Sequence, residues 1–235
     1  MYNLDANNIF EQMAEEHRAI SAMVDVFDKF IYQIQRGKSK IDVHDLQDVM
    51  YFFKFFVDQY HHAKEEQILF PAADKQSVVT KQGGPRCGFF FGMYLEQGHL
   101  SEVLLDVKAC SVAIPKYTPN PAIKSLLHEN NPLSIPLSEH EVGYYSMQLM
   151  GIELKKFQDD PSYNLDFFAK VASRYSEMLK KHIRKEDECL FVTLRKTFPA
   201  ELSKSLLQDF QNFNSQHFNE RSACLEKLDQ LRIKS

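Results

Sequence analysis

The sequence has neither a long apolar run nor a concentration of positive charge. No stretch approaches the ~20 apolar residues that cross a bilayer, and the amino terminus lacks the cationic and apolar regions of a signal peptide. The 28 basic and 32 acidic residues are scattered and give a formal net charge of -4, so no basic stripe can neutralise a phosphate backbone. These absences predict a cytoplasmic protein without a membrane or nucleic-acid partner.

Cysteine is also scarce. The sequence has four cysteines and no CxxC pair. This pattern predicts neither a disulfide framework nor a thiolate zinc site. Nitrogen and oxygen ligands must therefore carry any metal.

Glycine and proline are few, with 8 and 9 in 235 residues, and they cluster between long segments that contain almost none. Apolar residues in those segments recur at alternating steps of four and three, the spacing of a buried helical stripe. We expect an all-α fold, an up-down four-helix bundle forming one domain over residues 1–235. The predicted bundle helices span about 8–36, 42–70, 136–158 and 162–196. An insertion at about 72–133, with its own helix near 89–112, and one C-terminal helix at about 200–231 complete the prediction.

Each of the four apolar stripes contains a histidine. These residues are His17, His61, His140 and His182, and in the second and fourth helices a glutamate follows one turn later, Glu65 and Glu186. In this HxxxE spacing both side chains lie on the same face of a helix. Polar groups in a buried stripe are costly unless they are paired or coordinate a metal.

An internal repeat selects the same residues. The segments 61–70 and 182–191 align without gaps and are identical at five positions, and Glu-His precedes both of them, at Glu16-His17 and Glu139-His140. The histidines of each half are separated by similar lengths of chain, 44 and 42 residues. Two helical hairpins therefore present the same constellation, and packing them around a pseudo-twofold axis would bring two imidazoles and one carboxylate from each half to a common centre.

These motifs resemble those of the hemerythrin-like proteins, the HHE cation-binding family, over most of residues 9–70 and 134–198. The resemblance implies a four-helix bundle holding two iron ions, joined by an oxo or hydroxo bridge. It also implies the ligands: four terminal histidines, His17, His61, His140 and His182, and two bridging carboxylates, Glu65 and Glu186. This is a four-histidine version of the site. Oxygen-carrying hemerythrins have a fifth histidine one turn after the third-helix ligand, where this chain has Tyr144.

Several assignments stay open. Tyr144 either contacts a bound ligand or the metal, or only lines the core. His62, with Glu66, competes with His61 and Glu65, but the repeat aligns it with Ile183, which favours a solvated position or one outside the metal ligands. His99 is a further candidate on the inserted helix. The insertion departs from the family pattern, and its Arg86 and Cys87 are either a gate, a thiol partner or loop residues only.

A site with neutral histidines and only two carboxylates favours binding of a small diatomic ligand over powerful oxidation. The leading hypothesis is a non-haem diiron protein that binds dioxygen or nitric oxide for sensing, storage or detoxification. One alternative is an iron donor in iron-sulfur cluster repair under nitrosative or oxidative stress, with an iron-sulfur protein as partner. Another is a peroxidase-like or oxygenase-like diiron enzyme.

Overall fold

The computed structural model describes residues 2–37, 41–76, 98–127, 131 and 133–234, and the described part contains helices and no strands. Four long helical segments form a bundle. The first is α1 (Ile9–Gln35), and the second runs through α2 (Val43–Phe52), η1 (Phe53–His62), η2 (Glu65–Leu69) and α3 (Phe70–Lys75). The third is α7 (Ser134–Asp159), and the fourth runs through α8 (Asp166–Lys185), η4 (Glu186–Leu190) and α9 (Phe191–Thr197).

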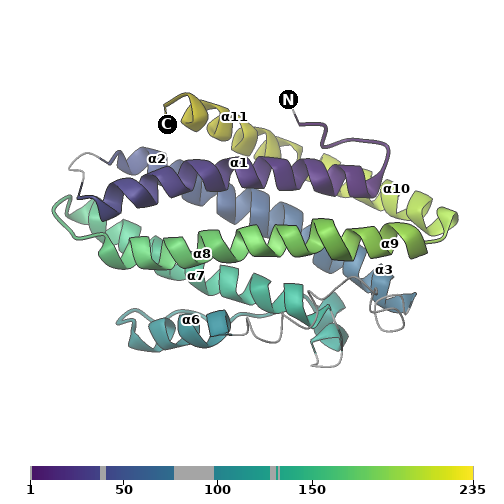
Figure 1. Cartoon of the computed structure of the whole chain (residues 1–235), viewed down its shortest axis with the longest axis horizontal. Helices are drawn as coiled ribbons and strands as arrows, with labels where there is room; N and C mark the ends of the chain where they lie inside the picture. Colours follow the sequence, from purple (N-terminus) through teal and green to yellow (C-terminus); the bar gives the residue numbers. More distant parts are fainter. Residues whose placement is uncertain (1, 38–40, 77–97, 128–130, 132, 235) are drawn as a thin grey trace.

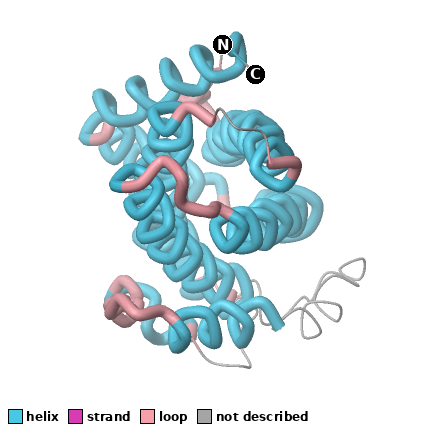
Figure 2. The backbone as a smooth tube through the Cα atoms, turned by 90° about the vertical axis from the view of Figure 1, so that its left-hand side faces the viewer, coloured by secondary structure: helices cyan, strands magenta, loops and turns pink. Residues whose placement is uncertain are grey.

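The segments surround one shared interior. α1 packs against α8 and η1, and α7 packs against α8, α2 and η1. Neighbouring segments run in opposite directions, and the view along the bundle shows them side by side (Figures 1 and 2). The predicted all-α, hemerythrin-type bundle is confirmed.

The second bundle helix begins where the sequence predicts and ends later. Asp42 caps it by accepting a hydrogen bond from the backbone N–H of His44 at 2.8 Å. The helix then continues past Pro71 to Lys75. Pro71 lies directly after the π-helical turn η2, where the Phe70 N–H bonds to the Glu65 carbonyl oxygen. The regular α-helical hydrogen bonding is thus already interrupted where the proline lacks its N–H.

The insertion supplies α6 (Gly98–Ala109) and the short 3₁₀ helix η3 (Pro121–Leu126). α6 packs along α7 (Figure 1), and Asp106 ties it to α8 by accepting from Arg174 at 2.8 Å and Lys170 at 3.1 Å. The part of the predicted inserted helix before residue 98 lies outside the described residues, as do Arg86 and Cys87.

The single C-terminal helix that the sequence predicts is two helices, α10 (Ala200–Gln216) and α11 (Phe218–Lys234). His217 separates them with non-helical backbone angles, and its Nδ1 lies 3.0 Å from the Phe213 carbonyl oxygen. α11 packs on α2, η1 and α1, while α10 packs on η2 and α1. The pair therefore covers the outer face of the second bundle helix.

Two further observations bear on the sequence predictions. The prediction about cysteines is wrong at Cys189, which is disulfide-bonded, whereas Cys110 and Cys224 are free. None of the described helices combines the length and the apolar character that a membrane-spanning helix requires.

Candidate metal centre

A polar layer divides the hydrophobic interior of the bundle into two clusters. One cluster extends along α1 from Ala19 onward, and the other includes Ile9, Phe10 and Met13 of the same helix. Between the two clusters on α1 lie Glu16 and His17. On each of the other three segments, buried polar residues likewise interrupt the apolar stripe at this level. All six predicted ligands lie in this layer, and none is more than 2% exposed: His17, His61, Glu65, His140, His182 and Glu186.

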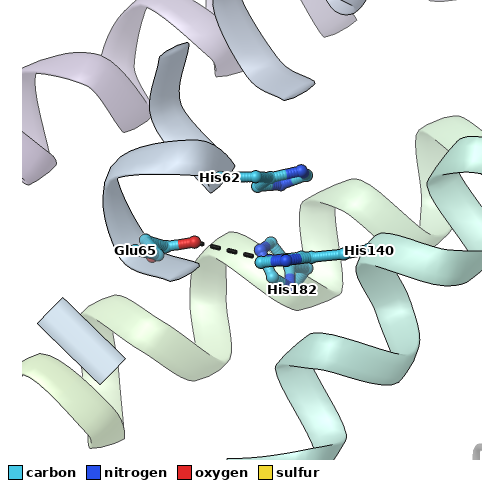
Figure 3. A group of neighbouring side chains, drawn as sticks. All are labelled: His62, Glu65, His140 and His182. Atoms are coloured by element: carbon cyan, nitrogen blue, oxygen red, sulfur yellow. Dashed lines mark ion pairs between the residues drawn. The ribbon is translucent and has the colours of Figure 1, made fainter. Parts of the chain in front are cut away.

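The layer contains two groups of donors that share one carboxylate. The first donor group consists of His17, His61, Glu65 and Glu186. The second donor group consists of His62, Glu65, His140 and His182, shown in Figure 3. Within each group the ligand atoms lie within 4.8 Å of one another. The bundle thus presents two adjacent positions for cations.

Both glutamates face histidines of both groups. Glu65 directs Oε1 toward His61 Nε2, at 4.0 Å, and Oε2 toward His140 Nε2, at 3.4 Å. Glu186 Oε2 is 3.3 Å from His17 Nε2 and 3.4 Å from His182 Nε2. Two ligand atoms about 2.1 Å from a metal, at right angles, are about 3 Å apart. The spacing therefore suits carboxylates that bridge two ions.

Four of these histidines contact a carboxylate through Nδ1, the ring nitrogen that faces away from the donor groups. The Nδ1 atoms lie 2.8 to 3.0 Å from a carboxylate oxygen in the pairs His17 with Asp187, His61 with Glu16, His140 with Glu66, and His182 with Glu139. An Nδ1–H donated to a carboxylate fixes the ring and turns the Nε2 lone pair toward the metal. Because Glu66 aligns with Asp187 and Glu16 with Glu139 in the repeat, the pseudo-twofold relation extends to these partners.

The inward-facing atoms lack the partners that buried polar groups require. Both carboxylate oxygens of Glu65 and of Glu186, and Nε2 of His140 and of His182, are buried without a hydrogen bond in the described structure. His17 Nε2 and His61 Nε2 are only 3.0 Å apart, so a shared proton or a metal ion must lie between them. Two divalent cations would satisfy all of these atoms, and the residues therefore fit a dinuclear metal centre.

The N-terminal third of the chain also matches a known family. Residues 8–85 match the family model of the hemerythrin HHE cation binding domain. The predicted resemblance to hemerythrin is thereby confirmed over this segment, which carries His17, His61 and Glu65. No curated protein and no solved structure matches the chain. The second hairpin lies outside this match and is related to the first by the internal repeat.

His62 is the main difference from the sequence prediction. We expected it to be solvated or outside the metal ligands, yet it is 4% exposed and belongs to the second donor group. Its ring stacks on that of His140 with centroids 3.8 Å apart. Neither ring nitrogen has a hydrogen bond to any residue that the structure describes, and Nδ1 is 3.6 Å from the Asp58 carboxylate. Among the described residues, the polar layer therefore contains five imidazoles, divided three and two between the donor groups.

The backbone explains why two adjacent histidines both face inward. Residues 53–62 and 65–69 form π-helical turns, as do residues 186–190 of the repeat. A π-turn closes hydrogen bonds from i to i+5, so successive residues are rotated less about the axis than in an α-helix, and such turns are frequent at functional sites. Reasoning from a 3.6-residue period placed His62 on a different face from His61. The one feature of the sequence that could have indicated His62 as a donor is its position directly next to His61.

A substitution at His62 tests its assignment to the second donor group. We expect His62→Ala to retain one metal ion at wild-type affinity and to bind the other about 10–100-fold more weakly, the range known for removal of even an outer partner. Chelator competition monitored by metal content would measure both affinities. The exposed His44 provides the control, as His44→Ala should change neither. Wild-type affinity for both ions in His62→Ala would exclude His62 as a ligand.

Tyr144 and the insertion occupy the rim of the site. The Tyr144 hydroxyl donates to the Pro115 carbonyl oxygen at 3.2 Å, and the residue is partly exposed. The insertion reaches the polar layer through Tyr117, whose hydroxyl donates to Glu66 at 3.3 Å. Glu66 in turn holds His140. The side chain of His99 lies outside the described part of the chain.

Proposed function

We propose that the chain is a non-haem diiron protein that binds a small diatomic ligand, dioxygen or nitric oxide, at the metal of the first donor group. The observation that supports this proposal is the unequal division of imidazoles, with three in the second donor group and two in the first. Glu65 belongs to both groups, and Glu186 Oε2 also lies 3.4 Å from His182 Nε2 of the second group. With both carboxylates facing both positions, the first metal would have one fewer nitrogen donor. The diatomic ligand would bind at that open position on the first metal.

The chemistry of the donors favours iron for this role. Imidazole suits iron, and two carboxylates balance part of the charge of an iron pair without the strongly anionic surroundings of carboxylate-rich diiron sites. An iron pair supplies reversible electron transfer to a bound diatomic molecule. The chain contributes fixed nitrogen ligands and a closed interior, because apolar clusters lie on both sides of the layer and exclude water.

The same geometry opposes the alternative of an iron donor. All six ligands predicted from the sequence are buried, and four histidines are each held by a carboxylate on Nδ1. Outer partners of this kind raise metal affinity and slow release. A protein that delivers iron to an apo iron-sulfur protein requires ligands that dissociate readily. The proposed role is therefore sensing, storage or detoxification of the diatomic ligand.

Absorption spectroscopy tests the proposal. We expect the reduced, iron-loaded protein to change its near-ultraviolet and visible absorption when dioxygen or nitric oxide is added, with one ligand bound per pair of irons. Absence of any spectral change with both gases would contradict the proposal. Transfer of both irons to an apo iron-sulfur protein on a comparable time scale would favour the iron-donor alternative instead.

Metal binding should release protons and strengthen as pH rises. Without a cation, burial and the charge of Glu186 raise the pKa of Glu65 to about 8. Burial opposes the charged form of His17, but its contacts with Asp187 and Glu186 outweigh burial and raise the pKa to about 10. Both groups must lose a proton to become ligands, so affinity should rise with pH up to about pH 8, where Glu65 ionises, and less steeply up to about pH 10, where His17 does. Titration calorimetry in buffers of different ionisation enthalpy would count the protons, and a count of zero would contradict the expectation.

A further inference from the structure

Lys64 is a completely buried cation beside the metal centre. Its side chain is 0% exposed. Its Nζ donates to Oε1 of Glu16 in a short ion pair and to the Asn214 side-chain oxygen at 3.0 Å, and it lies 4.1 Å from the centre of the Tyr60 ring. A buried ammonium is costly unless it is fully paired. The proposed function assigns no role to this lysine.

The carboxylate that Lys64 contacts also holds a metal ligand. Glu16 directs Oε1 to Lys64 and accepts a hydrogen bond on Oε2 from Nδ1 of His61 at 3.0 Å. Glu16 is itself 0% exposed. A continuous chain of contacts therefore leads from Asn214 on α10 through Lys64 and Glu16 to His61 of the first donor group.

Asn214 is fixed at the outer end of this chain. Its side-chain amide donates to the Leu4 carbonyl oxygen at 3.2 Å and to the Gln12 side-chain oxygen at 3.0 Å. Its side-chain oxygen accepts from the Tyr60 hydroxyl at 2.9 Å. Asn214 is 2% exposed. The position of Lys64 is thus set by α10, by α1 and by the N-terminal segment together.

The repeat contains a second copy of the inner part of this arrangement. Lys185 aligns with Lys64 and contacts Glu139, which holds Nδ1 of His182. The two halves thus use the same order of lysine, glutamate and histidine, and Lys64 is the copy that α10 engages through Asn214. This pairing provides a matched control within one molecule.

We propose that Lys64 is a positioning residue for the first donor group: held by Asn214, it keeps the Glu16 carboxylate against His61 Nδ1 and so strengthens the binding of one metal ion. The inference rests on the proposed metal centre. It gives the C-terminal helix α10, which lies outside the family-matched segment, a part in setting the affinity of the site. By the same reasoning, Lys185 keeps the Glu139 carboxylate against Nδ1 of His182.

The test compares two double variants of the full chain loaded with zinc, a diamagnetic ion suited to NMR. Lys64→Met with Glu16→Gln avoids leaving a buried carboxylate without its cation, and Lys185→Met with Glu139→Gln is the matched control. We expect each double variant to lower the affinity for one of the two ions about 10–100-fold, measured by chelator competition. The Nδ1–H resonance of His61 should shift only in the first double variant, and that of His182 only in the second.

A single variant, Asn214→Ala, provides an independent measurement that leaves Lys64 and Glu16 in place. We expect the affinity for one ion to fall by less than in the double variant. The Nδ1–H resonance of His61 should shift, and that of His182 should stay unchanged. This variant decides the question if the first double variant does not fold.

The outcomes separate this inference from the proposed metal centre. If the wild-type chain does not bind two ions, the metal centre itself is wrong. If the wild type binds two ions and Asn214→Ala or the folded double variant keeps the wild-type affinities and the wild-type His61 resonance, the positioning role of Lys64 is overturned.

Discussion

Glu65→Gln is expected to abolish tight binding of both metal ions, because Glu65 is the one residue common to the two donor groups. The change keeps the size of the side chain but removes the charge that would lie between two cations. Its two oxygens face His61 and His140, one in each group. We expect each affinity to fall by more than roughly 10–100-fold, the loss that removal of an outer partner alone produces. Metal analysis after dialysis against a chelator would measure the loss.

The neighbouring residue supplies the control for this substitution. Glu66 belongs to neither donor group and contacts His140 from the outside. We expect Glu66→Gln to retain both ions, with the second one more weakly held. If Glu65→Gln keeps two tightly bound ions, or if Glu66→Gln loses both, the assignment of the shared carboxylate is wrong.

Removal of the metal should lower the unfolding temperature substantially. An ion present at 100 times its dissociation constant stabilises the folded state by about 2.7 kcal/mol. In a chain of this size each kcal/mol corresponds to about 2–4 °C, so two ions should raise the midpoint by roughly 10–20 °C. The metal-free layer also retains buried carboxylates without partners, which opposes its stability. Calorimetry of the protein before and after chelation would measure the difference.

The Glu65→Gln variant tests whether this stabilisation arises at the site. Added metal should leave the unfolding temperature of that variant almost unchanged, while it restores the temperature of the metal-free wild type. An equal shift in both proteins would mean that the ions bind elsewhere. An unfolding temperature unaffected by chelation in the wild type would contradict a resident metal.

The periodicity of apolar residues predicted the bundle because a buried helical face has the same spacing wherever it occurs. Asp42 caps the second bundle helix at its predicted start, and the four bundle segments begin close to their predicted residues. The break at His217 was missed because it interrupts a sequence that is amphipathic on both sides. The continuation through Pro71 was missed because proline ends most helices, and no local pattern shows the π-helical turn that precedes it here.

The internal repeat predicted most of the site for a similar reason. Two copies of the same hairpin motif in the sequence select the same six residues, which are His17, His61, His140, His182, Glu65 and Glu186. The repeat could not identify His62, because its aligned partner is Ile183 and the site departs from twofold symmetry there. The repeat paired Glu66 with Asp187, but only the folded chain shows that each holds a histidine of the opposite half, Glu66 contacting His140 and Asp187 contacting His17.

The sequence by itself determined the helical bundle, its duplicated hairpins and six buried polar residues at one level of the interior. These follow from local spacing, which each segment carries independently of the others. The tertiary structure decided which donors share a carboxylate, the inward turn of His62 and the contact of α10 with Lys64. Those features depend on π-helical turns and on packing between segments distant in the chain, and no local pattern specifies them.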